Sequence, residues 1–310
     1  CSIRKADIEK EIAGLQRLSN QADIKLGLLN QYLNLFTLFK QHIVLTRNIE
    51  ESLRRLQDIR QMKKEGLITN NDVLRSEMQL TNDRLSLQET ENSILIVSQQ
   101  LNLLLGNSEN RIIKPDTTLL QKATPLESYE AYLLSAYEQA PDMKLLQKET
   151  ELARNQIQMN RASRKPNTLA RPITRTMTDL YNNNWNIGLS VSYPLSSLFK
   201  SDHKIKESQL QVSVQKKEEE LKKQQLQMDI YNAILRHKEA LQQADAWKLS
   251  VRQAQENYRI MQNRYMNQLA ILTDLLDANS VLLNAELQLT ASRTRIIYTY
   301  YQLQKVCGRL

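Results

Sequence analysis

The side chains that most often do chemistry are sparse in this chain. Its three histidines stand far apart, at positions 42, 203 and 237, on segments with a helical pattern. Cys1 and Cys307 form neither a metal-binding spacing nor an evident disulfide pair, and no glycine-rich phosphate loop is present. We therefore expect no catalytic site, no metal and no cofactor. We predict that His42, His203 and His237 lie on helix surfaces.

The charge pattern argues against a nucleic-acid partner. The net charge is +8, but basic residues stand among acidic ones, as in the run from Lys216 to Lys223. Such mixed runs are typical of a solvated helix face, whereas a nucleic-acid surface gathers Lys and Arg on one face with aromatic residues between them. No run of about 18 apolar residues occurs, so the sequence predicts no transmembrane helix.

Proline is confined to the middle of the chain. All six prolines lie between positions 115 and 194, which leaves both flanking segments free to be helical throughout. Residues 3–63 predict one helix, and at 1.5 Å per residue its length is roughly 90 Å. The turn Glu65–Asp72 separates it from a second helix that ends before Gly106. The short connection makes the two helices antiparallel, and Thr69 with Asp72 resembles a capping box.

A second copy of this hairpin follows 202 residues later. The turn Gln268–Asp274 echoes the turn Glu65–Asp72, and each is followed by apolar residues spaced by seven. These are Val73, Leu80, Leu87, Ile94 and Leu101 after the first turn, and Leu275, Leu282, Leu289, Ile296 and Leu303 after the second. The runs end on Gly106 and Gly308. Landmarks that match without a gap indicate internal duplication, so residues 3–106 and 205–308 are predicted to be two copies of one helical hairpin. In the second hairpin, the first helix is expected to begin near residue 202 and the returning helix to span about 272–306.

The segment between the hairpins contains the one clear strand pattern. Residues 185–193 alternate, with Ile187, Leu189, Val191 and Tyr193 on one side and small or polar residues on the other. The alternation leaves two alternatives open, a soluble sheet with its apolar face on a core and a membrane barrel with that face toward lipid. A partner strand is expected around 169–178. Shorter helices are expected around 126–138 and from Pro141 to about 163.

These elements predict a mainly α-helical chain in four parts. They are a first long hairpin at 1–106, loops and short helices at 107–163, a β-strand region at 164–200, and a second long hairpin at 201–310. Single hairpins expose apolar stripes on more than one face, so several must pack side by side. Cyclic oligomerisation is the natural way to close such an assembly. The second hairpin follows strand material, so by symmetry the first should too, and we expect the chain to be N-terminally incomplete.

Several short motifs resemble those of the TolC-type outer-membrane efflux proteins, and they occur in the same order, with the same duplication, over essentially the whole chain. The first hairpin carries Glu65-Gly66-Leu67-Ile68-Thr69, then Asp72-Val73-Leu74, and then Gln100-Leu101 leading to Gly106. The strand region carries Trp185-Asn186-Ile187-Gly188-Leu189-Ser190 and Tyr193-Pro194-Leu195. The second hairpin carries Asp274-Leu275-Leu276-Asp277-Ala278 leading to Asn284-Ala285-Glu286. No single motif is specific, whereas their shared order is.

The resemblance implies a homotrimer in the cell outer membrane. Strands from three chains would form a β-barrel, with Ile187, Leu189, Val191 and Tyr193 facing the outer-membrane lipid. The hairpins would form an α-helical, coiled-coil tunnel across the periplasm, with the turns at its inner tip. The resemblance also implies passive export of drugs, toxic compounds or other small molecules. A periplasmic adaptor (membrane fusion) protein and an inner-membrane transporter would be the partners and would supply the driving force.

The resemblance assigns a gate to the second turn. Asp274 and Asp277 match paired aspartates at the tunnel entrance of the family. Three chains would gather these carboxylates around one narrow opening, which favours cations and resists closure by like-charge repulsion. The simpler alternative is that Asp274 only caps the start of a helix.

Adaptor docking is assigned to the tips of both turns. Gly66, Leu67 and Ile68 of the first turn match these tips, as do Gln268 and Leu269 of the second. The simpler alternative is that Gly66 only ends a helix. Gln268 departs from the family, which usually has glycine there. The rival to the whole channel assignment is a soluble coiled-coil scaffold or interaction protein, which explains the heptads and the charge but not the alternating strand before the second hairpin.

Overall fold

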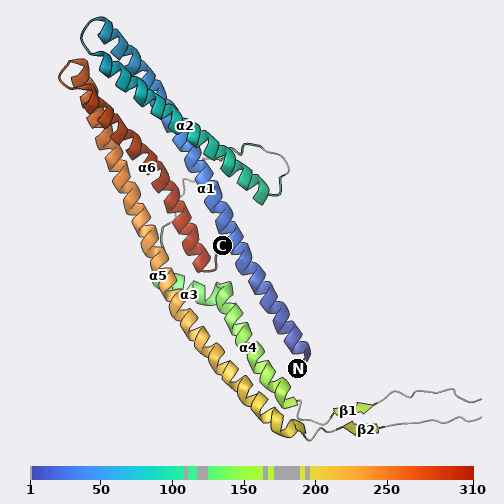
Figure 1. Ribbon diagram of the computed structural model, residues 1–310. Coiled ribbons are helices and arrows are strands. Elements are labelled where there is room, and N and C mark those ends of the chain that lie inside the picture. The colour runs from blue at the N-terminus through green and yellow to red at the C-terminus, as the bar shows by residue number, and fades with distance from the viewer. Residues whose placement is uncertain (1, 108–110, 117–124, 163–166, 171–188, 193–195) are drawn as a thin grey trace, which may run out of the picture. The chain divides into compact units, whose positions relative to one another are not determined.

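The described part of the chain is almost entirely helical (Figure 1). The computed structural model describes residues 2–107, 111–116, 125–162, 167–170, 189–192 and 196–310, and only the backbone of 167–170, 189–192 and 196–202. Its helices are α1 (Ser2–Lys64), α2 (Asn70–Leu104), α3 (Tyr129–Gln139), α4 (Pro141–Ala162), α5 (Ser196–Met266) and α6 (Leu272–Val306). The predicted bounds are confirmed to within three residues, except that α5 begins at Ser196 rather than near 202. It begins just after Pro194, because proline is tolerated at a helix start but not inside a helix.

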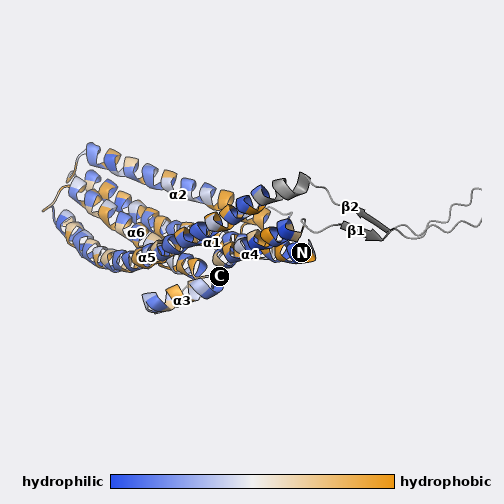
Figure 2. Ribbon diagram, turned by 90° about the horizontal axis from the view of Figure 1, so that it is seen from below, coloured by the Kyte–Doolittle hydropathy of each residue, from blue (hydrophilic) through white to orange (hydrophobic). Residues whose placement is uncertain are grey.

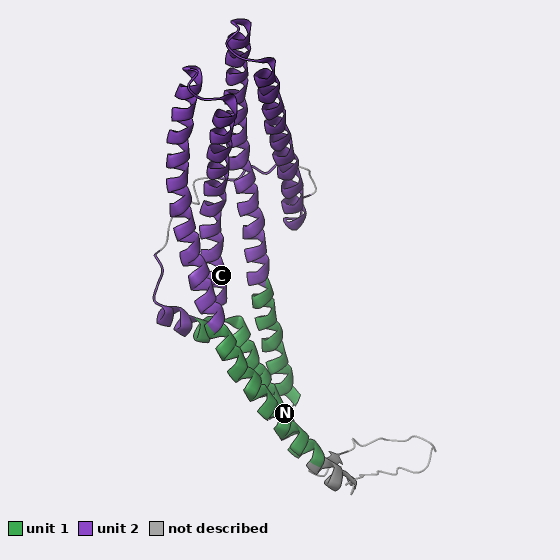
Figure 3. Cartoon of the chain, turned by 60° about the vertical axis from the view of Figure 1, so that its left-hand side comes forward, with its two compact units in different colours: residues 1–20, 136–227 green, residues 21–135, 228–310 purple. Residues whose placement is uncertain are grey.

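The chain divides into two compact units, coloured green and purple in Figure 3. Unit 1 comprises Cys1–Asn20 and Ala136–Gln227, and unit 2 comprises Gln21–Ser135 and Met228–Leu310. Unit 2 contains both turns and the helical arms that meet at them. Unit 1 contains the beginning of α1, all of α4, the first part of α5 and the described strands.

In unit 2, the spacing of seven marks the buried face of both hairpins. Val73, Leu80, Ile94 and Leu101 are buried in α2, as are Leu275 and Leu303 in α6. A second row of buried positions runs beside the first, and all its members except Val97 are small or polar. It comprises Ser76, Asp83, Thr90 and Val97 in α2, and Ala278, Ala285, Ser292 and Thr299 in α6. Each member in α6 stands 202 residues after its counterpart in α2, so the two hairpins bury equivalent faces.

An apolar cluster behind the two turns joins the four long helices that meet there, α1, α2, α5 and α6. It comprises Leu56, Ile59 and Met62 from α1, Val73 and Leu80 from α2, Tyr265 from α5, and Leu272 and Leu275 from α6. Burying one such side chain contributes about 1.5–3 kcal/mol. The cluster therefore holds the two turns side by side (Figure 1).

In unit 1, α4 is bonded to the beginnings of both long helices. Arg4 of α1 forms an ion pair with Glu151 at 3.0 Å. The side chain of Asn160 donates to the hydroxyl of Ser208 of α5 at 2.7 Å. Ile8 and Met143 are among the buried apolar residues of this unit.

The strand region forms a two-stranded antiparallel ribbon, β1 (Asn167–Ala170) with β2 (Leu189–Ser192). Asn167 lies opposite Ser192, and Ala170 lies opposite Leu189. This confirms a strand within the predicted range 185–193 and a partner that overlaps 169–178. The rest of both predicted ranges, including Ile187 and Tyr193, lies outside the described residues.

Hydrophilic and hydrophobic residues alternate along the helices rather than forming long apolar runs (Figure 2). Within the described ranges, no helix is both long enough and apolar enough to cross a membrane.

Candidate functional site

The two turns end their helices with the same backbone geometry. At Gly66 and at Gln268 the backbone N–H donates to the carbonyl three residues back, and the next N–H donates to the carbonyl five residues back. This is the Schellman motif, whose central residue takes the left-handed conformation. The φ angle is +74° at Gly66 and +61° at Gln268. Gln268 therefore adopts the conformation usual for glycine, at a cost of roughly 1 kcal/mol.

The two turns have the same backbone geometry, but the helices that follow them begin differently. The Asp72 carboxylate accepts hydrogen bonds from the backbone N–H and the hydroxyl of Thr69, at 3.1 and 2.8 Å. This confirms the predicted capping interaction. At the corresponding place in the second turn the cap residue is Ile271, and no side chain bonds the cap. Asp274 lies in the first turn of α6, where the helix dipole favours a carboxylate, but it does not form the capping hydrogen bond of its counterpart Asp72.

Asp274 and Asp277 lie one helical turn apart and are both exposed, so they share one face of α6. Neither carboxylate has a hydrogen bond or an ion pair with a described residue. The counterpart of Asp277 in the first hairpin is Arg75, so the two tips carry opposite charge at this position. The Arg75 guanidinium donates to the hydroxyl of Thr273 at 2.8 Å, which links α2 to the start of α6 directly beside Asp274.

The predicted docking residues divide into exposed and packed ones. The exposed fractions of Leu67 and Leu269 are 49% and 69%, and that of Ile271 beside them is 66%. Gly66 and Gln268 are also exposed. Ile68, in contrast, is half-buried against the apolar cluster behind the turns. The tips thus offer exposed apolar side chains from both hairpins, while Ile68 ties the first turn to the core.

A buried network of hydrogen-bonded side chains lies behind the turns and was not predicted from the sequence. The Ser52 hydroxyl donates to the Asp83 carboxylate at 2.8 Å, and the Arg55 guanidinium donates to Ser52 at 2.8 Å and to the Tyr258 hydroxyl at 3.1 Å. Asp83 and Arg55 are buried. This hydrogen-bonded network connects α2, α1 and α5. Its signal in the sequence was the position of Asp83 in the second buried row, where its counterpart is the apolar Ala285.

The prediction that all three histidines lie on helix surfaces is wrong for His237. Its side chain is buried, with an exposed fraction of 3%, and its Nδ1 lies 2.9 Å from the hydroxyl of Thr299. Burial lowers the pKa of His237 below its ordinary value of 6.5. The sequence did contain a signal, because the duplication aligns His237 with Leu35, which is fully buried in the first hairpin.

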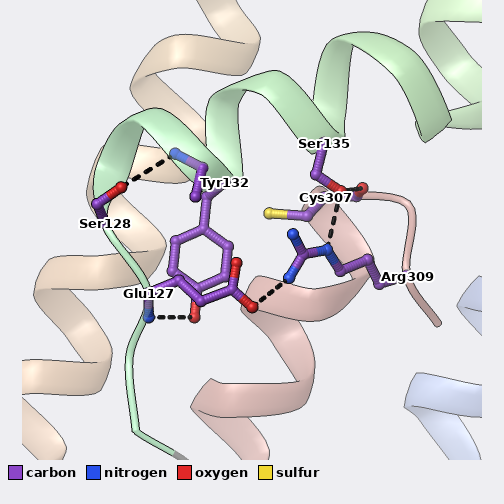
Figure 4. Close-up of polar contacts among 7 residues, drawn as sticks. Glu127, Ser128, Tyr132, Ser135, Cys307 and Arg309 are labelled. Atoms are coloured by element: carbon purple, nitrogen blue, oxygen red, sulfur yellow. Dashed lines mark hydrogen bonds and ion pairs between the residues drawn. The ribbon is translucent and has the colours of Figure 1, made fainter.

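The end of α6 is fastened to α3 by a second polar cluster (Figure 4). The Arg309 guanidinium donates to Glu127 at 2.7 Å and to the Ser135 hydroxyl at 2.8 Å, and it lies 5.5 Å from the centre of the Tyr132 ring. The hydrogen bond from Arg309 lowers the pKa of the Glu127 carboxyl. Beside it, burial raises the pKa of the Cys307 thiol to about 11, so this thiol is protonated and unreactive. The cluster is structural.

No group of side chains within the described residues has the composition of a metal site. The predicted lipid-facing side chains of Leu189 and Val191 belong to a strand whose backbone alone is described, so their orientation stays a prediction. The candidate site is therefore the pair of tips, with unpaired carboxylates on one and exposed apolar side chains on both.

Comparison with known proteins shows which family and which solved structures this fold is similar to. A family model described as outer membrane efflux protein matches residues 133–309. No curated protein sequence matches the chain. The outer membrane protein VceC from Vibrio cholerae has a TM-score of 0.82 at 18% identity, covering 98% of this chain and 74% of VceC. The MtrE outer membrane channel of Neisseria gonorrhoeae, in its open state, has a TM-score of 0.78 at 16% identity, covering 98% of this chain and 70% of MtrE. The CmeC outer membrane channel of Campylobacter jejuni has a TM-score of 0.78 at 15% identity, with 98% and 66% covered.

Proposed function

The chain belongs to the family of outer membrane efflux proteins, and from that premise we propose that it is the outer-membrane channel of a tripartite export system. Both the family and the fold are those of outer-membrane efflux channels and not those of an enzyme. The finer proposal is that it passively conducts small molecules, including drugs and toxic compounds, from the periplasm to the exterior. A periplasmic adaptor and an inner-membrane transporter complete the system.

A homotrimer is part of the proposal. The support is a row of apolar side chains on α5 that recur every seven residues, except at Gln242, and that remain exposed within the described part of the chain. The row comprises Val214, Leu221, Met228, Leu235 and Leu249. Heptad rows of this kind are covered by another helix in coiled coils, and a second copy of the chain supplies helices of matching length.

The observation that best supports a gate is the unpaired Asp274–Asp277 pair. A helix-start carboxylate that served only as a cap would be bonded as Asp72 is, whereas Asp274 is exposed and makes no capping bond. In a trimer, the pairs from three chains would surround one opening. Such a ring attracts cations and raises the free energy of the closed state.

Single-channel recording of the purified protein in planar bilayers tests the gate. The double substitution Asp274→Asn and Asp277→Asn is expected to lower the cation-to-anion permeability ratio severalfold. The matched control, Asp274→Glu with Asp277→Glu, keeps the charge and should keep the selectivity. Equal selectivity of the Asn and wild-type channels would remove these residues from the conduction path.

Adaptor docking at the tips is supported by the exposed Leu67 and Leu269. Replacing both with Asp should abolish drug export by cells and leave the conductance of the purified channel unchanged. The substitutions Leu249→Asp and Met228→Asp, on the α5 row far from the turns, provide the comparison, because they should disturb trimer assembly instead. Normal export by the Leu67 and Leu269 variant would refute docking at these tips.

A further inference from the structure

Nearly all the net charge of the chain is concentrated around its strand region. Residues 152–206 contain nine Lys or Arg and two Asp, a net charge of +7, whereas the whole chain carries +8. The mixture of signs noted for the chain as a whole therefore does not extend to this segment. A charge excess of this size within one segment of the sequence points to an anionic partner.

Four of these basic residues are described with their side chains, Arg154, Arg161, Lys204 and Lys206, and the last three lie together at the ends of two helices in unit 1. Arg161 stands at the end of α4, and Lys204 and Lys206 stand near the start of α5. All three are exposed. The neighbour of Arg161, Asn160, donates to the Lys204 carbonyl at 3.4 Å and to the Ser208 hydroxyl at 2.7 Å, which fixes the two helix ends side by side. We call Arg161, Lys204 and Lys206 the basic collar.

Some other basic residues of unit 1 have acidic partners. Arg4 pairs with Glu151 at 3.0 Å, and Lys148 with Glu11 at 2.6 Å, while Lys217 and Lys223 pair with acids of α5 at 2.7 and 3.0 Å. The basic collar has no ion pair with any side chain that the structure describes. Its nearest acidic neighbours in the sequence are Asp202 and the exposed Glu207, so the three positive charges are only partly balanced by nearby acids.

The position of the basic collar identifies the partner. Arg161 comes six residues before β1, and Lys204 comes twelve residues after β2. The aromatic residues Tyr193 and Phe199 lie between β2 and Lys204 in the sequence, as is common where a strand meets the membrane interface. If the strands enter the outer membrane and the helices extend into the periplasm, as the proposed function requires, the collar lies at the periplasmic surface of the membrane.

We propose that the basic collar binds the phosphate headgroups of acidic phospholipids in the periplasmic leaflet of the outer membrane. Juxtamembrane Lys and Arg side chains are attracted to anionic headgroups, and the attraction decays within a Debye length. Three chains arranged around one axis present nine such charges as a ring. The collar thereby fixes the depth at which the strands sit in the membrane.

Lipid titration of the purified full-length channel in nonionic detergent tests the proposal. Phosphatidylglycerol, phosphatidylcholine and lipid A are titrated separately, and bound lipid is counted by mass spectrometry of the intact complex. Wild type should bind phosphatidylglycerol more tightly, and the preference should vanish in about 1 M salt. The variant Arg161→Gln, Lys204→Gln, Lys206→Gln should lose roughly fivefold in phosphatidylglycerol affinity for each charge removed.

The matched control removes three exposed charges from α5 far from the strands, as Lys238→Gln, Lys248→Gln and Arg252→Gln, and it should bind as wild type does. Equal affinity of wild type and the collar variant for phosphatidylglycerol overturns the proposal. So does binding of lipid A, in place of phosphatidylglycerol, that depends on the collar. Conductance of the same samples separates the two proposals. A conducting channel with collar-independent lipid binding refutes the collar alone, whereas a wild type that does not conduct refutes the channel.

Discussion

The contact between His237 and Thr299 provides a test of the duplication at the level of single residues. In the second hairpin His237 is buried, and its Nδ1 lies 2.9 Å from the Thr299 hydroxyl. The equivalent residues of the first hairpin are Leu35 and Val97, which pack in one apolar cluster. The same contact is therefore apolar in the first hairpin, between two aliphatic side chains, and polar in the second hairpin, where it is a hydrogen bond.

The perturbation is to replace the polar pair by the apolar one, singly and together. The Thr299 hydroxyl donates to the backbone, with the Arg295 carbonyl at 2.9 Å and the Ile296 carbonyl at 3.0 Å, so its oxygen can accept a hydrogen bond from the Nδ1–H tautomer of His237. Thr299→Val removes this acceptor and should reduce the free energy of unfolding by about 1 kcal/mol, a typical net value for one hydrogen bond. The double variant His237→Leu with Thr299→Val should recover this loss, because an apolar pair leaves no buried group unsatisfied.

The pH dependence gives a second, independent readout. Burial lowers the pKa of His237 in the folded protein, so the unfolded chain binds a proton more readily than the folded one does. The contribution of His237 to stability is therefore complete above about pH 6.5 and is lost as the pH falls below it. Because the loss cannot exceed about 1.4 kcal/mol per pH unit, it is at most about 2 kcal/mol at pH 5.

Guanidinium unfolding followed by far-UV circular dichroism, between pH 5 and pH 8, measures both effects. The loss of stability between pH 7 and pH 5 should be smaller in His237→Leu than in wild type. His203→Leu, at an exposed histidine of α5, is the control and should leave the pH dependence unchanged. The reasoning is refuted if the double variant is less stable than Thr299→Val alone, or if His237→Leu unfolds with the pH profile of wild type.

Four further substitutions test local features of the fold. Gln268→Gly should raise the free energy of unfolding by about 1 kcal/mol by relieving a left-handed residue, whereas Gly66→Ala should lower it by a similar amount; unchanged denaturation midpoints would contradict both. Arg309→Ala should speed amide hydrogen exchange in α3 roughly tenfold, because α3 loses its fastening to the end of α6; unaltered exchange would show that the fastening is dispensable. Tyr258→Phe should cost about 2 kcal/mol, since it removes a partner of the buried Arg55 guanidinium; a melting temperature equal to that of wild type would contradict this.

The long helices could be predicted from the sequence because their signals are local and repeated. Proline is absent before residue 115 and after residue 194, and in each hairpin five apolar residues recur at a spacing of seven. The glycines at positions 66, 106 and 308 mark helix ends with positive φ. These features leave few alternatives for the backbone, so the predicted bounds of α6 agree with the structure.

Buried polar residues could not be predicted in the same way. His237 and Asp83 lie on faces that another helix covers, and a polar residue at such a place has the same local pattern as one facing water. What distinguishes them is the partner helix, which is distant in the sequence. Comparison of the two repeats supplies part of this information, since Leu35 and Ala285 stand at the equivalent positions. Asp274 likewise lacks a capping hydrogen bond because the cap residue is Ile271, whose side chain cannot donate as the Thr69 hydroxyl donates to Asp72.

The central claim is that this chain forms a conducting pore in the outer membrane. Its most direct test is the current across a planar bilayer after addition of the purified, trimeric full-length protein. Discrete and uniform conductance steps, selective for cations, are the predicted result. A correctly assembled trimer that inserts into the bilayer and passes no current would contradict the claim.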